Sequence, residues 1–223
     1  MNIPTQEAMY EASVHVGYSR SRRHPSVTSS LFGMKHRMDI INLQATGDQM
    51  QSAHDFLKTV LATGKKVLFV GTKPETKRMV EDTANKLDMP YVTKRWVGGT
   101  LTNFKQIRSR VDMLNDLQER TEAGTLVYRT KKEHLLLKRK MAKLDLNFGG
   151  VQDMKSLPGA VVVIDPKKEH LAVAEARRLA LPVIALANTD CDISIIDYPI
   201  VGNDANVDSV GLVLNTLTDG VKN

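Results

Sequence analysis

The sequence predicts an α/β fold in which about five parallel strands form a doubly wound sheet with helices on both faces. The first observation is a set of uninterrupted apolar segments, such as residues 67–71 and 160–164, which are typical of parallel strands buried on both sides. The second is that segments of helical periodicity alternate with them, as in βαβ units. The third is a basic, purely helical stretch between residues 104 and 148. It interrupts the alternation and predicts an inserted antiparallel helical hairpin.

Length and composition bound the class of protein. The chain has 223 residues, of which 42% are hydrophobic, enough for one α/β domain or one domain with an insertion. Its single cysteine, Cys191, excludes an internal disulfide framework and fits a reducing cytoplasm. We find no apolar stretch near the roughly 20 residues that a membrane helix requires. The N-terminus shows no signal peptide pattern.

The N-terminal extension is expected to span residues 1–43. Thr5 can cap a short helix that reaches about Ser13. Two strand-like pieces, residues 31–33 and 38–43, surround a polar and basic stretch. This arrangement predicts a β-hairpin whose basic turn protrudes.

The core domain is expected to comprise residues 44–97 and 150–223. The first part reads as a helix to about residue 62, a strand at 67–71, a helix opened by Pro74 and a strand at 91–93. After the insertion come a strand at 158–165, a helix at 167–180, strands at 182–187 and 198–201, and a final helix. Pro199 places the last strand at an edge of the sheet. The result is a flavodoxin-like, doubly wound arrangement.

The insertion is expected to form an arm over residues 98–149. Two apolar seams with heptad-like spacing support it: Phe104, Ile107, Val111 and Leu114 in the first helix, and Leu137, Met141, Leu144 and Phe148 in the second. The alternative is two ordinary helices packed flat on the sheet. The matched seams and the heavy basic load favour a coiled-coil arm. A glycine pair at each base suggests a structural hinge formed by Trp96, Gly98, Gly99, Gly149 and Gly150.

Charge is distributed unevenly along the chain, which has a net charge of +6. Residues 20–37 hold five Arg or Lys and no acid, and residues 94–143 hold 13 Lys or Arg against five acids. Residues 184–223 hold six aspartates against Lys222. The two basic segments predict contact with a polyanion. The acidic segment leaves open a protein-docking face that includes Asp204 and Asp208.

Nucleic-acid binding is the best-supported chemistry. We predict contacts to RNA from these residues: Arg20, Arg22, Arg23, His24, Lys35, Arg37, Lys94, Arg95, Thr102, Asn103, Lys105, Arg108, Lys131, Lys132 and Arg139. Any single lysine among them can instead be merely solvated. Trp96 can stack on a nucleotide beside Arg95 or be buried over the glycine turn. Aromatic residues are only 5% of the chain, so phosphate and shape contacts to folded RNA fit better than base stacking along a sheet.

Catalytic and metal chemistry have weaker support. A nucleotide-binding enzyme remains the alternative, with a pocket at the strand ends formed by Gly71-Thr72-Lys73, Asp165 and Asn188. The chain lacks the complete phosphate-binding loop motifs, and Asp165 can be a turn residue. The six histidines are scattered, Cys191 has no neighbour at ligand spacing, and no G-x-S-x-G elbow is present. We therefore expect no catalytic residues, no metal and no cofactor.

An ordered set of motifs carries a family resemblance. These are HVG at 15–17, LFG at 31–33, IINL at 40–43, LFVGTK at 68–73, RWVGGTLTNF at 95–104, GGVQDM at 149–154, VIDPKKE at 163–169, EARR at 175–178, LPV at 181–183, NTDCD at 188–192 and PIVGND at 199–204. With them the chain resembles the bacterial small-subunit ribosomal protein two family over nearly its whole length. Tyr18 departs from the pattern, because the family usually has a second histidine there.

The resemblance implies a structural constituent of the small ribosomal subunit in the cytoplasm and no enzyme. It implies small-subunit ribosomal RNA and neighbouring ribosomal proteins as partners, with large ribosomal protein one as a further partner. It implies neither a membrane nor a small-molecule substrate. It also favours Arg95 and Asn103 over Trp96 as RNA contacts, which leaves Trp96 to anchor the root of the arm.

Overall fold

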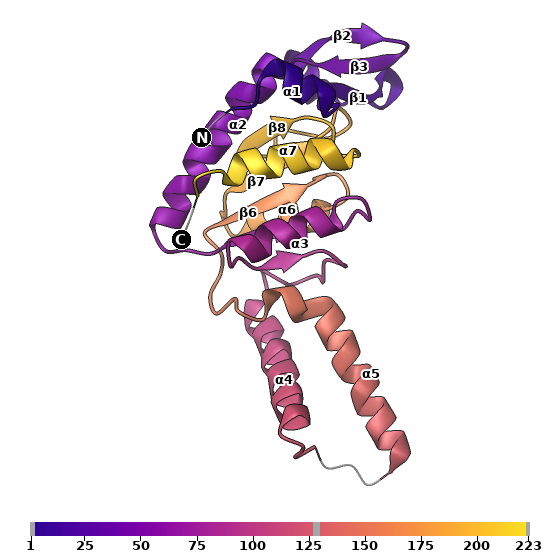
Figure 1. Ribbon diagram of the computed structural model, residues 1–223, viewed down its shortest axis with the longest axis vertical. Helices are drawn as coiled ribbons and strands as arrows, with labels where there is room; N and C mark the ends of the chain where they lie inside the picture. Colours follow the sequence, from indigo (N-terminus) through magenta and orange to yellow (C-terminus); the bar gives the residue numbers. More distant parts are fainter. Residues whose placement is uncertain (1–2, 127–129, 222–223) are drawn as a thin grey trace.

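The computed structural model describes residues 3–126 and 130–221. Figure 1 shows an elongated molecule with a small antiparallel sheet at one end, a central α/β layer and two long helices at the other end. The helices and strands follow one another as α1 (Gln6–Glu11), β1 (Val16–Ser19), β2 (Leu31–Lys35), β3 (Met38–Ile41), α2 (Leu43–Ala62), β4 (Val67–Val70), α3 (Lys77–Lys86), β5 (Tyr91–Val92), α4 (Phe104–Glu122), α5 (Lys131–Phe148), β6 (Ala160–Ile164), α6 (His170–Arg178), β7 (Val183–Ala187), β8 (Tyr198–Val201) and α7 (Val207–Thr218). Short 3₁₀ turns lie at Arg20–Arg22, Pro25–Ser30 and Gly149–Val151.

The central sheet confirms the predicted fold class. Its five strands are parallel in the order β5-β4-β6-β7-β8, the doubly wound order in which the chain reverses direction beside its first strand. Neighbouring residues of β4 point to opposite faces, so Val67 and Phe69 pack in one apolar cluster and Leu68 and Val70 in the other. Helices α2, α3 and α7 cover the first face, and α6 with the root of the arm covers the second. Burial on both faces explains why these strands are continuous apolar runs.

The N-terminal sheet has one strand more than predicted. The hairpin of β2 and β3 is present, and β1 pairs with the other side of β3 in an irregular antiparallel register. A strand of four residues with polar neighbours leaves little periodic signal in the sequence. This sheet lies against the carboxyl ends of β7 and β8, where the backbone N–H groups of His24 and Asn203 donate to the carbonyls of Thr189 and Val14.

Two predicted helix boundaries were wrong. Helix α3 begins at Lys77 and not at Pro74, because Pro74 lies in a turn in which the N–H groups of Thr76 and Lys77 donate to the carbonyl of Lys73. Helix α6 begins at His170, after another turn. In both cases the chain makes a tight turn at the strand end before the regular helix starts.

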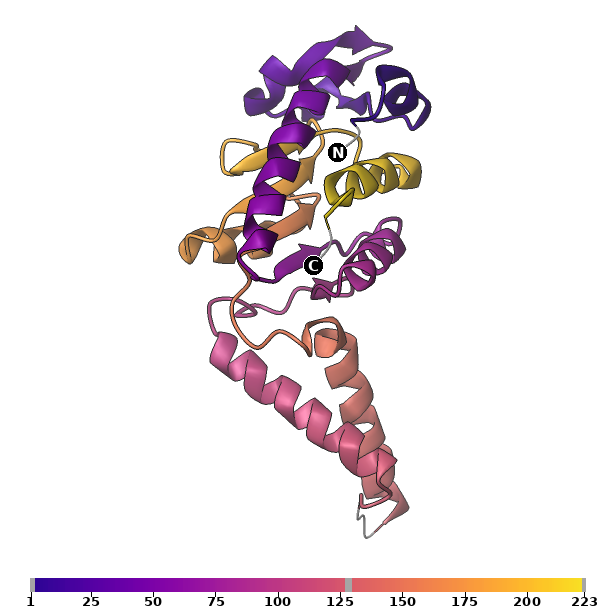
Figure 2. The same cartoon turned by 60° about the vertical axis from the view of Figure 1, so that its left-hand side comes forward.

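The inserted helices extend away from the sheet, side by side, in both views (Figures 1 and 2). In α4, Ile107, Val111 and Leu114 are buried, and in α5 the predicted seam positions are less exposed than the residues around them. Thr130 caps α5 by accepting a hydrogen bond from the N–H of Glu133 at 3.2 Å. The predicted seam residues thus lie on the less exposed side of each helix, and their packing as a coiled-coil arm stays a prediction.

Candidate nucleic-acid interface

Nine of the fifteen predicted RNA-contact residues are exposed cations that fall into two separate groups. The first, called here the hairpin-tip group, consists of Arg20, Lys35 and Arg37. His36 and Arg37 form the two-residue turn of the hairpin and both have a left-handed φ, 49° and 66°, the geometry that suits the twist of a tight β-hairpin. The N–H of Arg20 donates to the carbonyl of Arg37 at 3.1 Å, which brings the 3₁₀ turn of Arg20 beside the hairpin. All three side chains are exposed.

The second group, called here the arm group, lies at the root and along the second helix of the arm. Its members are the exposed residues Lys94, Arg95, Lys105, Lys131, Lys132 and Arg139. Within residues 3–126 and 130–221, the side chains of neither group have an acidic partner within ion-pair distance. Each group is thus a set of cations that the described protein leaves available to an outside anion.

Other predicted contact residues are held by internal partners. The Nε of Arg23 donates to Oδ2 of the buried Asp39 at 2.7 Å, and a second guanidinium nitrogen contacts Oδ1. Arg108 donates to the carbonyls of Gln152 and Met154 at 2.8 and 3.3 Å, which ties α4 to the segment that follows α5. These two cations are structural, because their donors already face carboxylate or carbonyl oxygens.

Arg22 and His24 are intermediate cases. Arg22 donates to Oδ2 of Asp190 at 3.0 Å and lies over the ring of Tyr18 at 4.2 Å, yet its side chain is 53% exposed. The imidazole of His24 accepts from the N–H of Ser26. Both join the N-terminal sheet to the core and keep only part of their surface for a partner.

The root of the arm gathers the predicted hinge residues. Trp96 is buried with Leu101 in the second apolar cluster. Gly99 has a left-handed φ of 89°, which side chains with a Cβ resist. A Cβ at Gly150 would lie 2.3 Å from the carbonyl oxygen of Tyr91, so this glycine permits a close approach of two backbones. Gly98 and Gly149 show neither feature, and hinge motion stays a prediction.

Sequence reasoning missed Glu175 as a residue of this root. Its carboxylate accepts hydrogen bonds from Trp96, Gly99, Leu101 and Thr102. Thr102 is exposed, but it also donates its hydroxyl proton to Glu175 at 3.0 Å, so that donor already has a partner within the protein. Asn103 is exposed and makes no side-chain bond to the start of α4. The presence of Glu175 in the EARR motif was the only signal in the sequence.

The carboxyl edge of the sheet, where a nucleotide pocket was the alternative, is filled by the protein's own charges. The Nζ of Lys73 lies 2.7 Å from Oδ2 of Asp165 and 2.8 Å from Oδ2 of Asp204. Asn188 donates to Oδ1 of Asp204 at 3.0 Å. The positive charge of Lys73 is already balanced by two carboxylates, and these carboxylates would repel a phosphate group. The site is a closed ion-pair network.

The pKa shifts in this network agree with a lysine that is paired with two carboxylates. Burial by itself would lower the pKa of Lys73, but the carboxylates of Asp204 and Asp165 outweigh burial and hold the pKa above its ordinary value. Burial raises the pKa of Asp204, and Lys73 and Asn188 offset part of that effect. The short contacts to an ammonium and an amide N–H are those of an ionised carboxylate.

The acidic C-terminal segment is exposed only in part: Asp197, Asp208 and Asp219 lie on the surface, and docking through this segment stays a prediction. Asp204 is 0% exposed and Asp190 is buried between Arg22 and Lys167. Of the two aspartates named for that face, only Asp208 lies on the surface, where it follows the N-cap of α7. Charge reversal at Asp204 would therefore disrupt the core and would not test docking.

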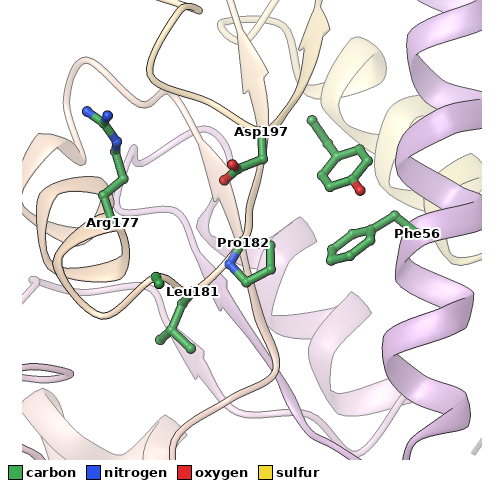
Figure 3. Close-up of a pocket in the computed structure, with 7 residues that line it drawn as sticks. Phe56, Arg177, Leu181, Pro182 and Asp197 are labelled. Atoms are coloured by element: carbon green, nitrogen blue, oxygen red, sulfur yellow. The ribbon is translucent and has the colours of Figure 1, made fainter.

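A hollow of about 590 Å³ lies at the amino ends of β7 and β8, the edge opposite to the ion-pair network (Figure 3). Phe56 and Tyr198 stack in its wall with ring centroids 4.1 Å apart. Asp197 uses Oδ2 to accept the N–H of Val183 at 2.9 Å. Because α/β sheets bind ligands at the carboxyl ends of their strands, this position gives no support to a nucleotide site.

Two further properties of the described residues bear on function. No helix within them is long and apolar enough to cross a membrane. They also contain no group of three or more His, Cys, Asp or Glu residues that could hold a metal ion.

Comparisons with known proteins match these features to one family. A family model described as ribosomal protein S2 matches residues 9–223. The chain is 41% identical to a protein named small ribosomal subunit protein uS2 from Rhodococcus opacus over 221 residues, which is 99% of this chain and 77% of that protein. It is 39% identical to the protein of the same name from Borreliella burgdorferi, covering 99% of this chain and 85% of that protein.

Proposed function

The chain belongs to the ribosomal protein S2 family, and from this premise we propose that it binds folded ribosomal RNA as a structural protein of the small ribosomal subunit. Members of this family are structural ribosomal proteins, so the chain is not an enzyme. Its place is the bacterial ribosome in the cytoplasm. The observation that supports RNA binding is the pair of basic groups, at the hairpin tip and on the arm, whose side chains have no acidic partner among residues 3–126 and 130–221.

The two groups suit two separate RNA segments. An RNA backbone carries a negative charge on every phosphate, and cations without internal partners gain most from it because they lose no ion pair on binding. Arg20, Arg37, Arg95 and Arg139 can each make bidentate contacts to phosphate, whereas the lysines act as point charges. The α/β core between them is a rigid spacer. We therefore expect the protein to bridge RNA elements and to read their shape more than their sequence.

Salt dependence tests the proposal. Anisotropy of labelled small-subunit ribosomal RNA, titrated with the full chain, gives the affinity at several salt concentrations. If six to ten phosphates are neutralised, affinity should fall roughly 10³- to 10⁵-fold between about 50 and 200 mM salt. An affinity that does not change over this range would contradict phosphate binding.

A protein neighbour is also part of the proposal. Strand β2 is an edge of the N-terminal sheet, and Phe32 and Met34 on its surface are 82% and 51% exposed. An apolar patch beside unpaired strand hydrogen-bonding groups is typical of a protein contact. We assign it to large ribosomal protein one, the partner that the family resemblance implies.

The variant Phe32→Ser tests this second contact. It should weaken capture of purified ribosomal protein one by the assembled small subunit. It should leave RNA affinity unchanged, because no cation is removed. Equal capture by both forms would remove the patch from the proposal.

A further inference from the structure

The carboxylate of Glu175 collects hydrogen-bond donors from one short loop. Oε1 accepts from Nε1 of Trp96 at 3.0 Å and from the N–H of Gly99 at 2.8 Å. Oε2 accepts from the N–H groups of Leu101 and Thr102, each at 3.0 Å, and from the hydroxyl of Thr102 at 3.0 Å. Five donors thus converge on the two oxygens of one side chain.

These donors would otherwise have no partner among the described residues. The loop leads directly into α4, whose own N-cap residue, Asn103, makes no side-chain capping bond. The turn before α4 is helix-like, since the N–H of Asn103 donates to the carbonyl of Gly99 at 2.8 Å. Glu175 therefore supplies from another helix the acceptor that a local N-cap would supply. Its negative charge also lies near the positive end of the α4 dipole.

Helix α6 is well placed to hold this acceptor still. Ala172, Val173 and Ala176 are buried against the second face of the sheet, so the helix that carries Glu175 is fixed to the core. Burial by itself would raise the pKa of the Glu175 carboxyl. The hydrogen bonds from the loop, with Thr102 foremost, outweigh burial and lower that pKa below its ordinary value. The loop thus favours the charged form.

We infer that Glu175 is a positioning residue that sets the direction of the α4–α5 arm relative to the α/β core. Other polar ties near the root run from Arg108 to Gln152 and Met154 and from Gln152 to Gln118. They join α4 to the segment that follows α5 and not to the sheet. The apolar contacts of Ile107, Val111 and Phe148 hold the arm near the core. Because apolar contacts have little directional preference, we assign the angle to the five hydrogen bonds of Glu175.

This role has a consequence for binding that rests on the proposed function. Lys131 and Lys132 lie at the start of α5, whose opposite end, at Phe148, is buried at the root of the arm. A small change of angle at Glu175 moves them by a distance that grows with the length of the helix. Glu175 would therefore affect RNA affinity without touching RNA.

The direction of the arm can be measured on the free, full chain. Spin labels at Lys138→Cys on α5 and Lys58→Cys on α2, in a Cys191→Ala background, give a distance distribution by pulsed electron paramagnetic resonance. Lys138 and Lys58 are exposed, and Cys191 is buried. We expect a narrow distribution for this background and a shifted, broader one for Glu175→Ala. The matched control Glu11→Gln, an exposed glutamate on α1, should leave it unchanged.

A conservative variant keeps the test decisive if Glu175→Ala does not fold. Glu175→Gln preserves size but places an NH₂ donor against the donors of the loop, and it should broaden the distribution as well. A native distribution in folded Glu175→Ala or in Glu175→Gln overturns the inference. Thermal midpoints measured in parallel show whether the core is intact.

The distance distribution and the RNA affinity report separately on the positioning role of Glu175 and on RNA binding by the arm. If the distance shifts in Glu175→Ala and RNA affinity stays constant, the positioning role holds and the arm is not an RNA contact. If RNA affinity falls while the distance distribution is unchanged, the positioning role is wrong.

Discussion

The carboxyl edge of the central sheet and the tip of the β2–β3 hairpin hold the same kinds of cation in opposite circumstances. At the sheet edge, Lys73 lies between Asp165 and Asp204. At the hairpin tip, Lys35 and Arg37 are exposed, and among the described residues they have no acidic partner. The contrast shows that charge alone does not identify an interface. A cation can act on an outside anion only where the fold has not already paired it.

The two regions also differ in what removal of a charge would cost. A buried ion pair adds little net stability, because burying both charges is costly. Removing one partner lowers the stability strongly, because the remaining charge has neither water nor a partner. An exposed cation among like charges contributes little to folding, and removing it relieves repulsion. The sheet edge should therefore respond to substitution through stability, and the hairpin tip through binding.

Lys73→Met tests the sheet edge and should have the largest effect. It leaves Asp165 and Asp204 facing each other without a cation. We expect the free energy of unfolding to fall by about 3–5 kcal/mol, measured by urea denaturation. The matched control Lys35→Met should change it by less than about 0.5 kcal/mol. Equal losses in both variants would remove the distinction between the two regions.

Trp96→Phe tests whether hydrogen bonds at the root of the arm stabilise the fold, as the ion pairs at the sheet edge are expected to do. The variant keeps an aromatic ring but removes the Nε1–H that donates to Glu175. A hydrogen bond to a charged group contributes about 1.5–3 kcal/mol, so a loss in that range is expected on denaturation. A loss near zero would show that burial of the ring alone anchors the arm.

The sequence predicted the sheet well because strand burial is a local property. In β4 and β6, four or five consecutive apolar residues are enough to indicate a strand that is buried on both faces. Pro199 correctly indicated that β8 is an edge strand. Thr5 was readable as a cap because its side chain bonds to an N–H three residues further along the chain.

The interface was harder to predict because its partners are distant in sequence. Arg23 meets Asp39 after 16 residues, Lys73 meets Asp204 after 131, and Glu175 meets Gly99 after 76. Nothing in the local pattern separates Arg23 from Arg20. Only the topology decides which cation faces a carboxylate and which faces solvent.

Removal of two cations from the hairpin tip tests the other side of the comparison. In Lys35→Gln/Arg37→Gln, the slope of log affinity against log salt should fall by about 2, roughly 1 for each phosphate that is no longer neutralised. The matched control is Lys58→Gln/Lys65→Gln, two exposed lysines outside both basic groups, and its slope should be unchanged. Identical slopes in both double variants would mean that the hairpin tip does not bind RNA.

Acidification gives the smallest effect and tests the arm root without a substitution. The pKa of Glu175 is lowered in the folded protein because the loop hydrogen bonds outweigh its burial. An acid with a lowered folded pKa contributes its full stabilisation above its ordinary pKa of about 4.3 and loses it as the pH falls through the folded value. The root should thus be intact at neutral pH and loosen only below about pH 4.3.

The fluorescence of Trp96, the single tryptophan of the chain, reports this change directly, because its Nε1–H donates to the titrating carboxylate. We expect an acid transition in the native chain that is absent from Glu175→Gln, whose side chain does not ionise. The same transition in both proteins would assign it to general acid unfolding.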